Sequence, residues 1–285
     1  EYSDRSRSHD YSVGMNYAIN KNHTIGGKYI GTISNYKLLD SPYDYMLTYK
    51  NNELLTSTDN KTDESEKEKF HNVNAYYIGK LSDKLQFNLD ADYVCSRLKH
   101  QQQVTETSQT DASSEVTHMQ NVQRNRAVAF KGVFAWSINE KHGLDFGTDF
   151  SKISSWGTSV NEEGKIANDQ FKNKETKYAG FVSYRLSSEK WRGSLGLRYE
   201  FVHAINTDQG EVRNKANYSD LLPSFSLSTS FGRVDLNLDF SSRVNRPSFR
   251  QLNNSVSYNN QYHYEQGNIY LKPQYVYDTE VSMNY

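Results

Sequence analysis

The chain has 285 residues and a formal net charge of −1, so charge gives no reason to expect nucleic acid as a partner. Only 35% of the residues are hydrophobic and the mean hydropathy is −0.86, but 22 Tyr, 13 Phe and 3 Trp make the chain too aromatic for a disordered protein. A polar average with many aromatic residues is typical of strands that have one wet face and one apolar face.

Alternation of apolar and polar residues runs along most of the chain and predicts an all-β fold. Between Leu85 and Cys95, for example, the odd-numbered residues are apolar or aromatic, and the even-numbered ones include Gln86, Asp90 and Asp92. Segments of this kind reach about ten residues, close to the ~9–11 of a tilted membrane-crossing strand. They predict about eleven strands, at residues 10–19, 23–33, 70–80, 85–97, 125–138, 142–155, 175–186, 190–204, 220–231, 233–245 and 275–285.

The connections between these segments alternate between short and long. The short ones are residues 20–22, 82–84, 139–141, 187–190 and 232–233. The long ones are residues 34–69, 98–124, 156–174, 205–219 and 246–274. Short turns on one rim and long loops on the other predict an antiparallel up-and-down transmembrane β-barrel. Residues 57–69 and 101–117 are polar and free of aromatic residues, so we expect solvated, mobile loops there.

A soluble sandwich or barrel with its apolar face inward would also show alternating strands. The length of the segments and the very polar second face favour a membrane. Tyr and Trp near the expected strand ends favour it as well, because these side chains settle at membrane interfaces. They are Tyr11, Tyr93, Trp136, Trp156, Trp191, Tyr199 and Tyr285. Single-chain bacterial barrels have even strand numbers, so an odd count predicts part of a larger barrel.

The C-terminal region carries the one recognisable motif, "SSRVNRPSFRQL" followed by "GNIYLKPQ". Its residues are Arg243, Arg246, Pro247, Ser248, Phe249 and Leu252, then Gly267, Asn268, Leu271, Lys272 and Pro273, with Glu280 in the next strand. Their order and spacing resemble the mid-barrel segment of TonB-dependent outer-membrane receptors. Ile269 and Gln274 stand where that family usually has Pro and Glu.

The resemblance implies a 22-stranded barrel closed by an N-terminal plug, in the outer membrane of a Gram-negative bacterium. Residues 1–285 would then form a partial barrel domain without the plug. Such receptors take up iron chelates, cobalamin, glycans or peptides with TonB-derived energy. The implied partners are outer-membrane lipid, the plug and remaining strands, the TonB system and a surface lipoprotein. The chain starts at Glu1 and stops within a predicted strand, so we expect a segment of a longer protein.

The physical reading of the motif is a rim loop between two strands. Pro247 ends one strand because it has no backbone N–H, and Pro273 stands where the next strand begins. Gly267 is expected to take a positive φ where the loop returns. We interpret these motif residues as structural, because receptors for unrelated ligands share them.

A second group in the same loop, "YNNQYHYEQ", combines Tyr258, Tyr262 and Tyr264 with amide side chains. Aromatic rings with a few polar groups can bind sugars or planar chelates, so this is the candidate ligand-contact loop. The alternative is an aromatic loop that packs on itself.

No catalytic motif is present, and we expect neither an enzyme nor a cofactor. The His residues are scattered without metal-ligand spacing, and the single Cys95 excludes an internal disulfide and a zinc site built from cysteines. Three functions remain open. They are an outer-membrane receptor coupled to TonB, an outer-membrane barrel without that coupling (a pore, an assembly protein or an adhesin), and a soluble all-β binding module.

Overall fold

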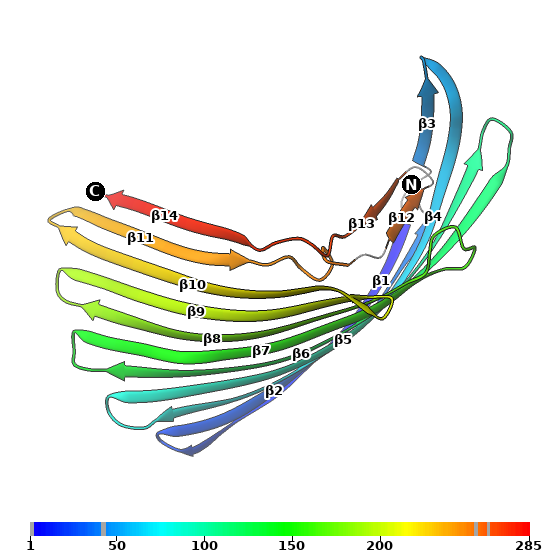
Figure 1. Ribbon diagram of the computed structural model, residues 1–285. Helices are drawn as coiled ribbons and strands as arrows, with labels where there is room; N and C mark the ends of the chain where they lie inside the picture. The colour runs from blue at the N-terminus through cyan, green and yellow to red at the C-terminus, as the bar shows by residue number, and fades with distance from the viewer. Residues whose placement is uncertain (1–2, 41–43, 254–255, 261–262) are drawn as a thin grey trace.

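The computed structural model describes residues 3–40, 44–253, 256–260 and 263–285. These residues form strands joined by turns, and no helix among them is long and apolar enough to cross a membrane. The strands form one large antiparallel sheet that curves into an open trough, with a separate two-stranded hairpin near one rim (Figure 1).

Fourteen strands lie in the described residues. They are β1 (Ser3–Asn20), β2 (His23–Asp40), β3 (Asp44–Lys50), β4 (Glu53–Lys80), β5 (Leu85–Ser108), β6 (Ser114–Ser137), β7 (His142–Asn161), β8 (Asp169–Ser187), β9 (Trp191–Asp208), β10 (Glu211–Phe231), β11 (Val234–Asn245), β12 (Val256–Asn260), β13 (His263–Gln266) and β14 (Gln274–Asn284). All eleven predicted segments fall in strands of the main path, β1-β2-β4-β5-β6-β7-β8-β9-β10-β11-β14. The fold class predicted from the sequence is confirmed, and β3, β12 and β13 were not predicted.

Each strand presents alternate side chains to two faces of the sheet. We call inner the face that carries Asp90, Asp149 and Glu200, against which the described residues of the segment 246–273 pack. We call short-turn rim the edge of the sheet that carries the connections at residues 21–22, 81–84, 138–141, 188–190 and 232–233. The opposite, outer face is covered with apolar side chains in the half of the sheet next to these turns. Leu195 and Leu221 are 61% and 62% exposed there, and Phe87, Phe134 and Phe146 stack in a row across β5, β6 and β7. Apolar exposure on this scale requires a nonpolar environment around the sheet.

The expectation of long loops at 34–69, 98–124, 156–174 and 205–219 is wrong. β5 and β6 continue to a short turn at 109–113, and β9 and β10 are joined by Gln209 and Gly210, which have φ angles of 50° and 82°. Residues 57–69 and 101–117, expected to be mobile, are paired strand residues, except at the 109–113 turn. The ladder hydrogen bonds satisfy the backbone with any side chains, so strands can continue where both faces are polar.

The longer strands also change the position of several aromatic residues. Tyr11, Tyr93 and Tyr199 were expected near strand ends but lie well inside β1, β5 and β9. Trp136 and Trp191 do lie beside short turns. Between β11 and β14, which are neighbours on the main path, the chain makes a long excursion over residues 246–273, and this excursion carries most of the motif identified in the sequence.

Candidate functional site

Arg246 fastens the excursion to the inner face of the sheet. Its guanidinium donates from Nη1 to Oε2 of Glu200 at 2.9 Å and from Nη2 to Oδ2 of Asp220 at 2.7 Å. Both carboxylates are buried, at 7% and 4% exposure. The Tyr275 hydroxyl donates to the second oxygen of Asp220 at 2.7 Å. One side chain of the motif therefore binds two acids from β9 and β10, in the geometry that a guanidinium favours.

Further charges of alternating sign extend this contact along the inner face. Arg198 donates from Nε to Glu200 at 2.8 Å and from Nη2 to Asp149 at 2.9 Å. The ammonium of Lys177 lies 3.8 Å from Asp149. A network from β7 to β10 thus surrounds Arg246, and its acids are neutralised by neighbouring cations.

After Arg246 the chain makes a tight turn at residues 248–251, and residues 267–268 lie beside this turn. The side-chain oxygen of Gln251 accepts from the backbone N–H of Ser248 at 2.8 Å. The N–H groups of Gly267 and Asn268 donate to the carbonyls of Asn253 and Gln251, at 2.9 and 2.7 Å. Backbone hydrogen bonds therefore hold residues 251–253 and 267–268 of the excursion together.

Gly267 does not have the positive φ expected from the sequence. Any Cβ at this position would collide with the carbonyl oxygens of Asn253 and Gln251. The physical requirement for glycine is therefore the close approach of two backbone segments.

The other motif residues complete this fold. The Asn268 side chain accepts from the N–H of Tyr270 at 2.9 Å, and the carbonyl of the buried Ile269 accepts from the Asn214 amide at 2.8 Å. Arg243 forms an ion pair with Asp278 on β14. Pro273 directly precedes β14, as the sequence predicted. The remaining motif residues line the turn, Phe249 and Leu252 half-buried and Leu271 and Lys272 exposed.

Tyr258, on β12 in the middle of the excursion, makes a second contact with the inner face. Its ring is 7% exposed and packs with Val104 and Met119 of β5 and β6, which are 0% and 3% exposed. The hydroxyl donates to Oε2 of Glu106 at 2.5 Å. Burial and this carboxylate both raise the pKa of Tyr258. This contact places the β12–β13 hairpin against the sheet.

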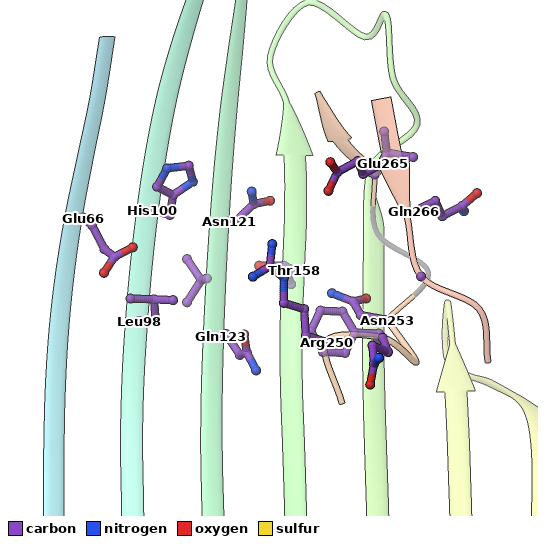
Figure 2. A pocket seen from close by; sticks show the side chains of 15 residues that line it. Glu66, Leu98, His100, Asn121, Gln123, Thr158, Arg250, Asn253, Glu265 and Gln266 are labelled. Carbon is purple, nitrogen blue, oxygen red and sulfur yellow. The ribbon is translucent and has the colours of Figure 1, made fainter. Parts of the chain in front are cut away.

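A cavity of about 550 Å³ lies between the excursion and the inner wall (Figure 2). The wall contributes Glu66 from β4, His100 from β5 and Phe171 from β8, and the excursion contributes Arg250 and Glu265. Amides complete the lining on both sides, namely Asn121, Gln123, Gln251, Asn253 and Gln266. The volume and the mixture of apolar and polar groups are those of a small-molecule site.

The wall of this cavity is acidic on the side formed by β4. The imidazole of His100 lies 3.9 Å from a carboxylate oxygen of Glu64, and this neighbour lowers the pKa of the Glu64 carboxyl despite partial burial. Glu64 therefore stays ionised beside Glu66 at neutral pH. With Glu265 facing them, the cavity can accept hydrogen bonds from a ligand and attract positive charge, while Arg250 supplies a cation.

A second cavity of about 510 Å³ is lined by Tyr258 and Tyr264 of the hairpin and by Lys165 and Ile166 of the turn between β7 and β8. Tyr264 is 63% exposed, whereas Tyr258 is held by the sheet. Tyr262 lies outside the described residues. The predicted ligand-contact loop thus divides into a buried ring and an exposed one, and its contact with a ligand stays a prediction.

Sequence reasoning missed the wall of the first cavity. Glu66, His100 and Phe171 lie in segments interpreted as loops, far apart in sequence. The alternation "ESEKEK" at residues 64–69 was an available signal, because a period of two in charge also predicts a strand.

Among solved structures, this chain is similar to BauA, the ferric preacinetobactin receptor from Acinetobacter baumannii, with a TM-score of 0.62 and 10% identity. The match covers 98% of this chain and 44% of that one, so the chain spans less than half of this receptor. The ferric-catecholate import receptor Fiu from E. coli K12 matches at a TM-score of 0.47 and 9% identity, over 99% of this chain and 55% of that one. At this identity the likeness to BauA shows the shared fold.

A search of curated proteins finds no match. The model of the outer membrane protein beta-barrel family matches residues 79–285, which is well over half of the chain. This match agrees with the antiparallel strands and the apolar outer face, and it sets aside the soluble module considered from the sequence. The chain belongs to the outer membrane protein beta-barrel family, as part of a transmembrane barrel of the outer membrane.

Proposed function

We propose that the chain is part of the barrel of an active-transport receptor. The receptor binds a scarce ligand at the cell surface and passes it through a plugged barrel with TonB-derived energy. The observation that carries this proposal is the cavity between the inner wall and residues 246–273, at the rim opposite the short turns. In bacterial barrels the periplasmic connections are all short and the longer ones lie outside, so the rim that carries residues 246–273 and the extension of β3 and β4 would face the outside.

The lining of the cavity suits a ligand that presents several hydrogen-bonding groups. Phe171 and Leu98 supply apolar surface, while amides and the charged Arg250 and Glu265 supply donors and acceptors. Iron chelates, cobalamin, glycans and peptides all offer such groups. A ligand at this position would contact both the wall and the excursion, so binding would depend on how Arg246 and Tyr258 hold the excursion in place.

The partners follow from the same proposal. A plug domain and the remaining strands would close the barrel around the inner face, and the TonB system would act through that plug. A surface lipoprotein could cover the outer rim. The motif residues from Arg243 to Pro273 would shape the rim. The exposed Tyr264 would add a ring contact to the ligand, and Tyr258 would hold the hairpin that carries it.

The experiment uses the complete protein that contains this chain. A deletion strain is grown with ferric siderophores, cobalamin, glycans or peptides as the limiting nutrient, and the nutrient that needs the gene is then used in binding assays. Replacing Arg250 and Glu265 together by Ala should weaken binding about tenfold, since each side chain can form hydrogen bonds to charged groups. The control replaces Glu189 and Arg233, on the short-turn rim, by Ala and should leave affinity unchanged.

Energy coupling is tested by uptake in cells treated with a protonophore. Surface binding should persist and uptake should stop. Uptake that continues at the same rate would favour the barrel without TonB coupling, and a nutrient phenotype unaffected by the cavity variant would place the ligand elsewhere.

A further inference from the structure

Basic side chains gather on the outer face above the apolar region. Lys69, Arg97, Arg124 and Lys172 lie in a single row of the ladder, in which Lys69 pairs with Arg97, Arg97 with Arg124, Arg124 with Trp156 and Trp156 with Lys172. Neighbouring rows of the same face add further cations. We call the whole set the outer basic belt: Lys67, Lys69, Arg97, Lys99, Arg124, Arg126, Lys152, Lys172 and Lys174.

The belt places like charges directly opposite one another. Lys67 faces Lys99, and Lys69, Arg97 and Arg124 follow one another across three strands. Such pairs destabilise a sheet unless something compensates them. No Asp or Glu occupies the belt's rows on this face of the described strands, and none of its members has an ion pair with a described carboxylate. The missing negative charge must therefore come from outside the sheet.

In the same rows of the ladder and next to them, the inner face carries acids instead of bases. In the segment "ESEKEK", Glu64, Glu66 and Glu68 point to the inner face and Lys67 and Lys69 to the outer one, because successive residues of a strand alternate. In β8, Lys172 and Lys174 point outward, while Asn173 and Glu175 point inward. The sequence separates charge by face, and a randomly solvated loop would have no reason to do so.

The belt begins where a membrane-crossing segment ends. Arg97 lies about 12 residues beyond the first residue of β5, and a crossing strand needs about 9–11. The Arg124 guanidinium lies 5.3 Å from the ring centroid of Trp156, and Trp is typical of membrane interfaces. These positions put the belt at the head groups of the outer leaflet.

Directly below the belt, the apolar region contains a hollow of about 970 Å³. Its floor is formed by the small residues Gly132, Thr148 and Gly180, which lie in one row of the ladder. Its walls are aromatic side chains, namely Phe87, Phe130, Phe134, Phe146, Phe150, Tyr178, Tyr199 and Phe201. The hollow is continuous with the surface that faces acyl chains.

We propose that the outer basic belt and this hollow together bind a lipid of the outer leaflet that carries phosphate on its head group and several acyl chains. Arg97 and Arg124 bind phosphate oxygens, the lysines neutralise the remaining charge, and an acyl chain fills the hollow over Gly132 and Gly180. This surface is separate from the ligand cavity, which lies on the inner face, and the proposal holds whatever ligand the barrel transports.

The test uses the complete protein in nanodiscs of a neutral phospholipid and measures binding of bis-phosphorylated, hexa-acylated lipid A. Lipid A stripped of phosphate, phosphatidylglycerol and inorganic phosphate are the comparison probes. The wild type should bind the phosphorylated lipid A about tenfold or more tightly than the stripped form, because each cation near a membrane surface adds appreciably to the attraction. Inorganic phosphate at millimolar concentration should not compete.

The variant replaces Lys69, Arg97, Arg124 and Lys172 by Gln and should lose about tenfold or more in affinity for phosphorylated lipid A. A matched control removes four exposed cations from the short-turn rim, Lys21, Lys141, Lys190 and Arg233, and should leave affinity within about twofold of the wild type. Equal binding of stripped lipid A or of phosphatidylglycerol, competition by inorganic phosphate, or an equal loss in the control would overturn the proposal.

The hollow is tested separately by Gly180→Phe. A Cβ at Gly180 would meet no other atom within 4 Å, so the sheet can accept the ring and the ring can occupy the hollow. We expect weaker binding of both phosphorylated and stripped lipid A, with the preference for phosphate retained. Unchanged binding of both lipids would remove the hollow from the site.

Discussion

The half of the sheet beside the short turns and the half beside the opposite rim share one backbone pattern but differ in side chains. Near the short turns, Leu89, Phe134 and Phe146 cover the outer face and Asp90 and Asp145 lie on the inner one. Near the other rim, the outer face is basic at Arg97 and Arg124, and the inner face carries acids, amides and the folded-in excursion. The ladder continues unbroken through both halves.

The difference shows that the environment of each strand selects apolar or polar side chains, whereas the backbone hydrogen bonds of the ladder allow the strand to continue through both environments. Lipid allows only apolar side chains outside, whereas above the membrane both faces meet water and the outer one meets lipid head groups. The change from apolar to basic on the outer face therefore marks the membrane boundary along β4 to β8.

The largest effect is expected where the excursion meets the inner face. Arg246→Met would leave Glu200 and Asp220 buried without their shared cation, which should reduce the free energy of unfolding by about 3–5 kcal/mol. Urea unfolding of the complete barrel in lipid vesicles measures it. The matched change Arg243→Met removes an exposed pair with Asp278 and should cost no more than about 1 kcal/mol. Equal costs would show that burial of the Arg246 contact contributes nothing.

A single cation introduced on the outer face should destabilise the barrel in the apolar half of the sheet and have little effect in the other half. Leu238→Arg places a cation in the apolar half and should cost about 2–4 kcal/mol, measured in the same way. Gln101→Arg, on the outer face beyond the belt, should change stability by less than about 0.5 kcal/mol. Asn237→Arg, on the inner face beside Leu238, should also be mild. Similar costs at Leu238 and Asn237 would contradict the assignment of faces.

A smaller effect is expected at the second attachment of the excursion. Tyr258→Phe keeps the ring packed on Val104 and Met119 but removes the hydrogen bond to Glu106, which should cost about 1–3 kcal/mol because the buried Glu106 loses this donor. Hydrogen exchange of the β12–β13 amides should speed up in this variant while that of β5 and β6 does not. Unchanged exchange of the hairpin would show that ring packing alone holds it.

The smallest effect concerns pH at the turn between β7 and β8. Burial alone would raise the pKa of Glu163, but the backbone N–H and the imidazole of His118 lower it to about 2 from an ordinary value of 4.5. The contribution to stability is therefore full above about pH 4.5 and is lost as pH falls toward 2. His118→Ala should raise the pKa of Glu163, which a carboxyl NMR titration can follow. An unchanged titration would exclude the imidazole as a cause and leave the backbone N–H of residue 118, which the variant keeps.

The sequence predicted the half of the fold that faces lipid and missed the other half for a physical reason. Apolar alternation at Leu85–Cys95 can be recognised in a single strand, because lipid imposes it. Residues 57–69 are polar throughout and alternate between acid and base only from Glu66 to Lys69, so their strand character appears once β5 lies beside them. Gln209 and Gly210 form a turn that the polar composition of 205–219 concealed.

The site was predictable only in part. Pro247 and Pro273 marked the ends of the excursion correctly, but nothing near Arg246 in the sequence identifies Glu200 or Asp220 as its partners. The cavity brings Glu66 and Glu265 together across about two hundred residues of sequence, and a contact of that kind follows from topology.

The boundary between the two halves can be measured along a single strand. In a Cys95→Ser background, spin labels at the outer-face positions 87, 89, 91, 93, 97, 99 and 101 of β5 are compared for contact with oxygen, which dissolves in lipid, and with a water-soluble nickel chelate. The account predicts that oxygen contact dominates through 93 and that chelate contact dominates from 97 onward. Oxygen contact that continues through 101, or chelate contact already at 89, would contradict it.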